Sequence, residues 1–262
     1  MSSFLIESAL LCHGIKGVDD ETFLDMWPAE YDTIVWVQDG KVTIGNKSEF
    51  IIFKNSYQSQ NRICFSNYDE MIQNNESGAL TASGTLRCCH DLGYELAVSC
   101  GLGGLSPNKE NNIVESADDV TVFDEIKDVS LLGTSPKDMF SLKLTIEAWE
   151  KRGVKVVGLK HSTIRGYMFS GEPIEIRSNR EKLLDNQQYV YLNEINEERK
   201  IEDQNVLVQA VKYGSCQSKL GYDFQPAVNE KIDYLTNKYS SFLQLKSLID
   251  NVKWAKNLLT NN

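Results

Sequence analysis

The chain has 262 residues, 41% of them hydrophobic, and its 27 basic and 37 acidic residues give a formal charge of −10. This length and apolar content allow one large α/β core and exclude global disorder. The negative charge and the lack of a Lys/Arg stripe argue against nucleic-acid binding, because phosphate backbones would be repelled.

The N-terminal segment shows no signal peptide. The apolar run Phe4–Ile6 follows no basic residue and is broken by Glu7 and Ser8, and no apolar stretch approaches the ~18 residues that suggest a membrane span. We therefore expect a cytoplasmic protein without a membrane anchor. The six cysteines lack CxxC spacing and are expected to be free thiols, and the three scattered histidines disfavour a zinc site.

The first half of the chain predicts a hairpin and then a helix followed by a strand. Two apolar segments, 33–37 and 41–45, flank an Asp-Gly pair, which is a strong hairpin signal. Residues 81–92 read as a helix that ends at Gly93, followed by a strand over 94–99 and a glycine-rich turn at 101–104. A hairpin next to parallel strands makes a mixed sheet.

The second half predicts a βαβ unit over 129–159 and a C-terminal helix over 240–259 preceded by a shorter helix. In the βαβ unit Ser135 would be the N-cap, Pro136 the first helical residue and Gly153 the stop. The polar stretch 178–203 gives no clear pattern. With no repeat or linker, we expect a single domain over 1–262, a three-layer α/β/α fold with a mixed central sheet.

Lys137 has the strongest chemical signal. At the second position of the predicted helix, the positive end of the helix dipole disfavours an ammonium group. Its pKa would fall toward the free amine that Schiff-base chemistry needs. The alternative is an exposed lysine that pairs with Asp138.

Three further groups carry weaker signals. Glu7 ends an apolar run, where partial burial would raise its pKa into the general-acid range, although it could also be solvated. The glycine turn could bind an anion through backbone N–H groups or could be a tight turn or close backbone approach. Asp118 and Asp119 offer oxygen ligands for a divalent cation or form an acidic surface loop. His13 reads as a hydrogen-bonded histidine near a turn.

Taken in chain order, these motifs resemble the pseudouridine-5′-phosphate glycosidase family. The matching segments are Glu7–Gly14 (family Glu-Ser-Thr-Ile-Ile-x-His-Gly), Thr81–Thr85 (Thr-Val-Ala-x-Thr), Gly101–Gly104 (Gly-Gly-Ile-Gly-Gly), Ser116–Asp118 (Ser-Ala-Asp), Ser135–Asp138 (Gly-Ala-Lys-Ser) and Asp250–Lys253 (Asn-Asn-Ala/Val).

The resemblance implies roles for these residues. Lys137 would attack the anomeric carbon of a sugar and form a ring-opened imine while the C–C bond to the base breaks. Glu7 would be the acid and base, Asn251 a further catalytic residue, and Asp118 the ligand of a divalent metal, Mn²⁺ in the family. The substrate-binding residues would be Thr81, Gly101, Gly103, Gly104, Ser116 and His13. The resemblance also implies a homotrimer.

The phosphate-binding motifs depart from the family. Where the family has Val-His-Arg-Gly after the glycine turn, this chain has Leu105-Ser106-Pro107-Asn108, and residues 66–76, where a Lys-Arg-Asp segment is expected, contain no Lys or Arg. We therefore expect a lysine-imine C-glycosidase, or a C-glycoside synthase in reverse, acting on a small C-nucleoside with altered or absent 5′-phosphate recognition. The alternatives are a non-catalytic binding or regulatory member of the fold and an unrelated small-molecule-binding α/β protein.

Overall fold

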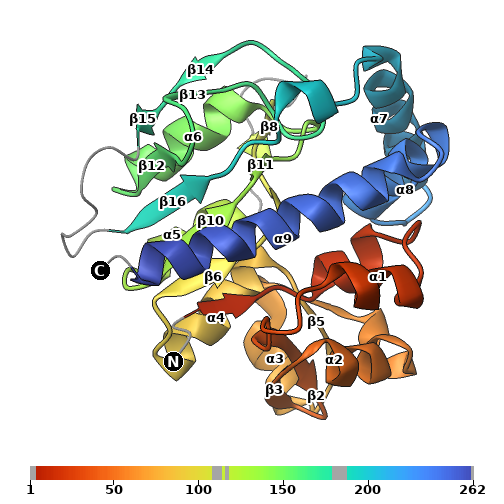
Figure 1. Ribbon diagram of the computed structural model, residues 1–262, viewed down its shortest axis with the longest axis vertical. Helices are drawn as coiled ribbons and strands as arrows, with labels where there is room; N and C mark the ends of the chain where they lie inside the picture. Colours follow the sequence, from red (N-terminus) through yellow and green to blue (C-terminus); the bar gives the residue numbers. More distant parts are fainter. Residues whose placement is uncertain (1–3, 108–113, 116–117, 179–187, 261–262) are drawn as a thin grey trace.

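A computed structural model describes residues 4–107, 114–115, 118–178 and 188–260. A large central sheet lies between helices (Figure 1), and its strand order is β15-β12-β16-β10-β6-β1-β2-β5-β4, with β3 paired to β2. The strands are β1 Phe4–Ile6, β2 Ile34–Gln38, β3 Lys41–Gly45, β4 Arg62–Ile63, β5 Gly78–Leu80, β6 Leu96–Val98, β10 Ser130–Gly133, β12 Lys155–Gly158, β15 Arg177–Ser178 and β16 Tyr189–Leu192. Short strand pairs outside it are β7 Gly101–Leu102 with β11 Ser135–Pro136, β8 Ser106–Pro107 with β9 Val114–Glu115, and β13 Thr163–Ile164 with β14 Ile174–Glu175.

The sheet is mixed, as expected. Strand β1 pairs in parallel with β2 and β6, whereas β2 runs antiparallel to β3 and β5. The predicted hairpin is confirmed, and its turn residues Asp39 and Gly40 have φ values of 50° and 69°, the left-handed conformation that an Asp-Gly turn supplies. The parallel strands β1 and β6 are buried along their whole length, which is why they read as continuous apolar runs.

Helices cover both faces of the sheet. They are α1 Asp20–Met26, α2 Lys47–Lys54, α3 Tyr68–Gln73, α4 Ala82–Leu92, α5 Asp118–Glu125, α6 Leu142–Lys151, α7 Gln204–Ser218, α8 Phe224–Leu235 and α9 Tyr239–Thr260. In β1, Phe4 and Ile6 belong to the apolar layer shared with α9, and Leu5 to the layer shared with α4, α5 and α6. The fold is therefore the expected three-layer α/β/α arrangement, with α9 crossing one face in Figure 1.

The predicted start of the helix at Ser135 is wrong. Ser135–Pro136 form β11, which pairs with β7, and α6 begins at Leu142 behind the N-cap Ser141. The Ser141 hydroxyl accepts a hydrogen bond from the Leu144 N–H group (3.3 Å), so this serine provides the cap that we had expected from Ser135. Pairing with the glycine turn keeps the segment around Ser135 extended.

Other predicted elements are confirmed. Helix α4 begins behind Thr81 and ends at Gly93, whose φ is 74°, and α9 forms as the long C-terminal helix. The polar stretch 178–203, which has no clear sequence pattern, contains strand β16. Because β16 lies between β10 and β12, the two strands of the predicted βαβ unit are parallel but not adjacent.

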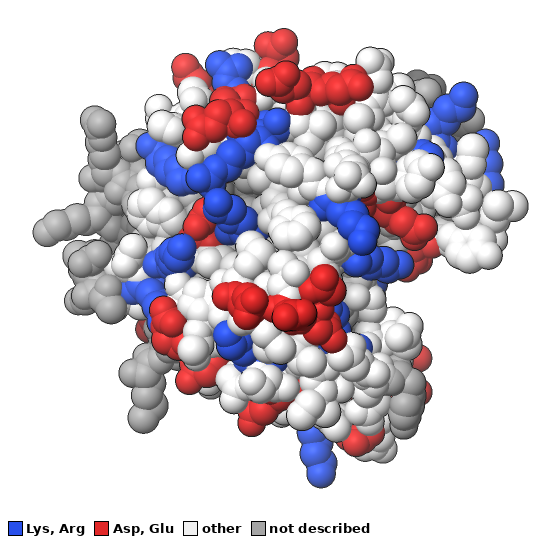
Figure 2. Space-filling view, turned by 45° about the vertical axis from the view of Figure 1, so that its right-hand side comes forward, with Lys and Arg blue, Asp and Glu red and all other residues white. Residues whose placement is uncertain are grey.

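All six cysteines are free thiols, as expected. Among the described residues, no helix combines the length and apolar character needed to cross a bilayer. Acidic and basic side chains are interspersed on the face in Figure 2.

Candidate active site

A cavity of about 500 Å³ collects most of the predicted site residues. Glu7 reaches it from the end of β1, Lys137 from the end of β11, and the first turns of α8 form the opposite wall. Its lining includes these predicted residues: Glu7, His13, Thr81, Gly101, Gly103, Gly104, Asp118 and Lys137. Separate positions of Glu7 and Lys137 would have supported the third alternative, an unrelated small-molecule-binding α/β protein, but the two residues share this cavity.

Lys137 is held by the pairing of β11 with β7. Its N–H donates to the Leu102 carbonyl (3.0 Å), and its Nζ donates to Gln225 Oε1 on α8 (3.0 Å). Desolvation in the cavity wall lowers the pKa of Lys137, and nearby Arg62 lowers it further. The pKa of this amine thus falls as predicted, but the helix-dipole reason is wrong, because Lys137 follows a strand.

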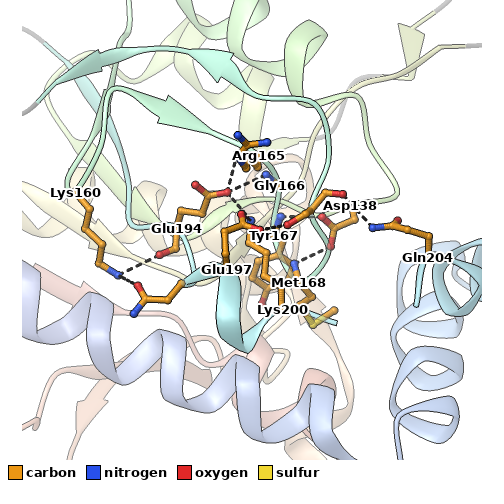
Figure 3. Close-up of polar contacts among 12 residues, drawn as sticks. Asp138, Lys160, Arg165, Gly166, Tyr167, Met168, Glu194, Glu197, Lys200 and Gln204 are labelled. Carbon is orange, nitrogen blue, oxygen red and sulfur yellow. Dashed lines mark hydrogen bonds and ion pairs between the residues drawn. The ribbon is translucent and has the colours of Figure 1, made fainter. Parts of the chain in front are cut away.

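The alternative ion pair of Lys137 with Asp138 is also wrong. Asp138 accepts hydrogen bonds from the N–H groups of Tyr167 (2.7 Å) and Met168 (2.8 Å), as Figure 3 shows. The Asp138 carboxylate therefore binds the 167–168 segment instead of the Lys137 amine, which lines the cavity and donates to Gln225.

Glu7 is only 5% exposed, so the solvated alternative is wrong. Desolvation raises the pKa of Glu7 to about 7, with Lys137 opposing this shift and Asp119 adding to it. Because the pKa of Glu7 is raised and that of Lys137 is lowered, both groups are shifted toward their uncharged forms. A neutral amine beside a protonated carboxyl group is a nucleophile beside a general acid.

Replacing Glu7 with Gln should stabilise the fold at alkaline pH. Because the pKa of Glu7 is higher in the folded state than in the unfolded chain, ionisation of Glu7 destabilises the fold. This destabilisation is absent at low pH, begins above the unfolded-state pKa and is complete above pH 7. A rise from 4.5 to about 7 corresponds to a gain on the order of 3 kcal/mol for the variant at pH 8. Urea unfolding at pH 5 and pH 8 measures it, and a gain that does not increase with pH would contradict the burial argument.

The backbone of the glycine turn lies close to neighbouring side chains, and one of its N–H groups is already hydrogen-bonded within the protein. A Cβ atom on Gly104 would lie 2.6 Å from Thr145 Oγ1. The Gly103 N–H donates to Asp119 Oδ2 (2.6 Å), and Asp119 Oδ1 accepts from the Ser83 N–H (2.9 Å). Asp119, which our site prediction left out, therefore joins the turn to the start of α4.

Gly101→Ala should damage the site. An added Cβ would lie 2.7 Å from the Tyr167 ring and 3.0 Å from Lys137 Cγ. Because both neighbours are packed, we expect a loss of about 1–3 kcal/mol in unfolding free energy and a displaced Lys137. Chemical denaturation and substrate turnover measure the two effects. Gly93→Ala is the control, since no atom lies within 4 Å of its added Cβ and its positive φ affects stability alone; equal activity losses in both variants would contradict this account.

Asp118 lies at the start of α5 on the cavity wall. Its Oδ2 accepts hydrogen bonds from the Ser66 N–H (3.0 Å) and hydroxyl (2.7 Å). The described part of the chain has no cluster of three or more His, Cys, Asp or Glu side chains able to hold a metal ion. This donor set fits a hydrated cation such as Mg²⁺ or Mn²⁺ held by one carboxylate, rather than a closed protein cage.

His13 and Thr81 take up different roles in the wall. His13 lies in the π-helical turn Leu10–Gly14, and desolvation together with Arg62 lowers its pKa to about 4, so the ring is neutral at pH 7. Among the described residues its buried Nε2 has no hydrogen-bond partner, so the predicted local hydrogen bond does not involve this atom. Thr81 caps α4 by accepting from the Gly84 N–H (3.4 Å).

One predicted residue, Asn251, is not in the cavity lining, and another cannot be placed relative to it. Ser116 lies outside the described residues. Asn251 is fully buried on α9, where it donates to the Ser99 carbonyl (2.7 Å) and Thr134 Oγ1 (3.0 Å). Asn251 thus holds the residues that follow β6 and β10 and does not face the cavity.

Sequence reasoning missed several polar residues of the wall besides Asp119, among them one arginine and two amides. Arg62 comes from β4, four residues before the segment searched for a cation, and Gln225 and Asn229 come from α8. Lys160 and Arg165, two cations far along the chain, line other cavities, and Lys109 lies outside the described residues. Among the described residues of the lining, Arg62 is thus the cation, apart from Lys137, that could receive an anionic part of a substrate.

The chain is similar to proteins of known family. The model of the family "Indigoidine synthase A like protein" matches residues 28–258. A pseudouridine-5′-phosphate glycosidase of Glaesserella parasuis is 24% identical over 84% of this chain and 75% of its own length. Another, of Staphylococcus aureus, is 24% identical over 66% of this chain, which spans 58% of that protein.

Two solved structures have the same fold. An indigoidine synthase A-like protein from Thermotoga maritima superposes with a TM-score of 0.75 at 16% identity, and the prealnumycin C-glycosynthase AlnA, in complex with ribulose 5-phosphate, with a TM-score of 0.74 at 15% identity. In both cases the match covers 97% of this chain and 91% of the other. The family model spans most of the chain, so the protein belongs to the indigoidine synthase A-like family, which confirms the predicted resemblance to pseudouridine-5′-phosphate glycosidases.

Proposed function

We propose that the protein is a lysine-imine C-glycosidase, or a C-glycoside synthase using the same step in reverse. The observation that carries the proposal is Lys137 and Glu7 in one cavity, with pKa shifts that favour a neutral amine and a protonated carboxyl group. The relatives named pseudouridine-5′-phosphate glycosidase and the structural neighbour named C-glycosynthase support a C-nucleoside substrate.

The first step opens the sugar ring. Glu7 donates its proton to the ring oxygen, the C1′–O4′ bond breaks, and the Lys137 amine forms a bond to C1′. The resulting ammonium returns a proton to the Glu7 carboxylate, so the product is a secondary amine beside a protonated acid. No oxygen links the base to the sugar, so the usual protonation of a glycosidic oxygen is not possible, and covalent attack by an amine provides another route.

The second step breaks the C–C bond. The nitrogen lone pair forms the C1′=N bond while the electrons of the bond to the base move to the base carbon, which takes the proton from Glu7. Water then adds to C1′, and collapse of the adduct releases the open-chain aldehyde and the free Lys137 amine. The lysine nitrogen thus supplies the electron pair that expels the base, and the base carbon accepts the electrons of the broken bond.

Asp118 would hold a divalent cation, which supplies positive charge to a substrate oxygen when bound. We expect a chelator to lower the activity of the wild type and added Mn²⁺ to restore it. The activity of Asp118→Asn should respond to neither. Steady-state assays with and without chelator measure it, with Asp124→Asn on the same helix as the control. Unchanged metal dependence in Asp118→Asn would contradict this site.

Arg62 is the basis of our proposal of altered phosphate recognition, with one arginine in place of the family's motifs. Arg62→Gln should raise KM for a 5′-phosphorylated substrate by about 10–100-fold, because a charge-assisted hydrogen bond contributes about 1.5–3 kcal/mol. The KM of the unphosphorylated substrate should change little. Parallel assays of pseudouridine and its 5′-phosphate test this, and equal effects on both would contradict it.

Product analysis tests the function directly. The full chain is incubated with pseudouridine or its 5′-phosphate in the presence of Mn²⁺, and released uracil is quantified by chromatography. We expect uracil and an equal amount of the sugar aldehyde. Binding of both compounds without uracil release, and without pseudouridine formation from uracil and the sugar, would favour the non-catalytic alternative.

A further inference from the structure

A second cavity, of about 180 Å³, lies away from the candidate active site and shares none of its lining residues. Its wall combines the segment after β12, the segment that runs from the end of β16 through the short helix Glu197–Arg199, and the middle of α9. Three segments distant in sequence thus meet at one opening.

Three cations from three of these segments line the opening: Lys160, Arg199 and Lys246. Within the described residues, none of them lies within 4.0 Å of a carboxylate oxygen as an ion pair. Lys160 Nζ donates to the Glu194 carbonyl (3.1 Å) and to Asn196 Oδ1 (3.4 Å), which leaves its charge uncompensated by these neutral acceptors.

The acidic groups of the wall are engaged elsewhere. Figure 3 shows the Glu194 carboxylate directed to the N–H groups of Arg165 and Gly166 and to Lys200, whose Nζ lies 2.5 Å away. Asp250 pairs with Lys253 at 3.6 Å and also attracts Lys160. With Glu194 bound to Lys200, the three cations of the opening face one further carboxylate, that of Asp250, so the lining has an excess of positive charge in a protein whose formal charge is −10.

The base of the cavity adds a buried acceptor. Asn193 is 2% exposed and donates through Nδ2 to Asn251 Oδ1 (2.8 Å). The orientation of this pair is fixed, because Asn251 Nδ2 donates to the Ser99 carbonyl. Among the described residues Asn193 Oδ1 has no hydrogen-bond partner, and a buried acceptor without a partner is unfavourable until a donor reaches it.

We propose that this cavity is a binding site for a small phosphorylated polyol. The phosphate lies among Lys160, Arg199 and Lys246, whose ammonium and guanidinium groups suit a dianion. A hydroxyl group of the same ligand donates to Asn193 Oδ1. Burial lowers the pKa of Lys160. Attraction to Asp250 raises this pKa, repulsion from Arg199 lowers it, and a bound dianion relieves this repulsion.

Titration calorimetry with glycerol 3-phosphate tests the site in the full chain. An Arg62→Gln background removes the cation of the active-site cavity, and we expect saturable binding to persist there. Adding Arg199→Gln and Lys246→Gln should weaken binding about 100-fold, roughly ten-fold for each lost charge-assisted bond. The matched pair Lys212→Gln on α7 and Lys219→Gln at its C-cap changes the net charge equally and should leave affinity within about two-fold.

Three results would overturn the proposal. Loss of binding in Arg62→Gln alone would assign the phosphate to the active-site cavity. Equal weakening by the control pair would show a general charge effect, and inorganic phosphate binding as tightly as glycerol 3-phosphate would remove the role of Asn193. The five substituted cations contribute no ion pair within the described structure, so unchanged thermal unfolding midpoints are expected. The outcome does not depend on the proposed glycosidase activity.

Discussion

Lys137→Met is expected to lower kcat for C–C cleavage by on the order of 10⁴-fold or more, because the covalent route through an imine is lost. The side chain keeps a similar length, so substrate binding should change far less than turnover. Lys137→Arg should not restore activity, since a guanidinium remains protonated and cannot act as the nucleophile. Steady-state assays of uracil release from pseudouridine 5′-phosphate measure both variants.

The control for Lys137 is Lys212→Met, which removes an exposed lysine of α7 and should behave like the wild type. Circular dichroism and unfolding curves establish that the variants are folded. If Lys137→Met kept more than about 1% of wild-type kcat, the imine route would be wrong, because one missing nucleophile cannot leave that much covalent catalysis.

Glu7→Gln is expected to lower kcat by about 10²–10⁴-fold, the usual contribution of a general acid or base. Glu7 must be protonated for ring opening and its pKa is raised to about 7, so wild-type activity should fall as the pH rises through neutrality. The residual activity of Glu7→Gln should lack this alkaline limb.

The pH profile of kcat from pH 5 to pH 9 tests the role of Glu7. Glu30→Gln, at an exposed position, is the matched control and should keep both the rate and the profile of the wild type. An alkaline limb near pH 7 that persisted in Glu7→Gln would assign the titration to another group.

Local sequence rules predicted the elements with strong end signals. The Asp39-Gly40 turn and the Thr81 and Gly93 ends of α4 depend on neighbouring residues, so the pattern alone places them. Several site residues were found for a similar reason, since Glu7 and the glycine turn follow directly after predicted strands at one edge of the sheet.

What the sequence could not show depends on tertiary contacts. Both Ser135 and Ser141 are plausible N-caps, and pairing of β11 with β7 decides between them. Strand β16 lies within the polar stretch 178–203 and is stabilised by its neighbours β10 and β12. The low pKa of Lys137 comes from burial among residues distant in sequence, which no helix pattern reveals.

The site residues that sequence reasoning missed are also brought together by tertiary contacts. Arg62 and Gln225 come from segments more than 150 residues apart, so spacing along the chain does not connect them. Ser116 lies outside the described residues. The single-domain organisation, the homotrimer and the cytoplasmic location stay predictions.

Reductive trapping on Lys137 tests the central claim most directly. The full chain is mixed with pseudouridine or its 5′-phosphate, treated with borohydride and digested, and peptides are analysed by mass spectrometry. Our account predicts a reduced sugar adduct on Lys137 that requires both substrate and borohydride, and that is absent from Lys137→Met. Uracil release without any adduct on Lys137, or an adduct only on other lysines, would contradict it.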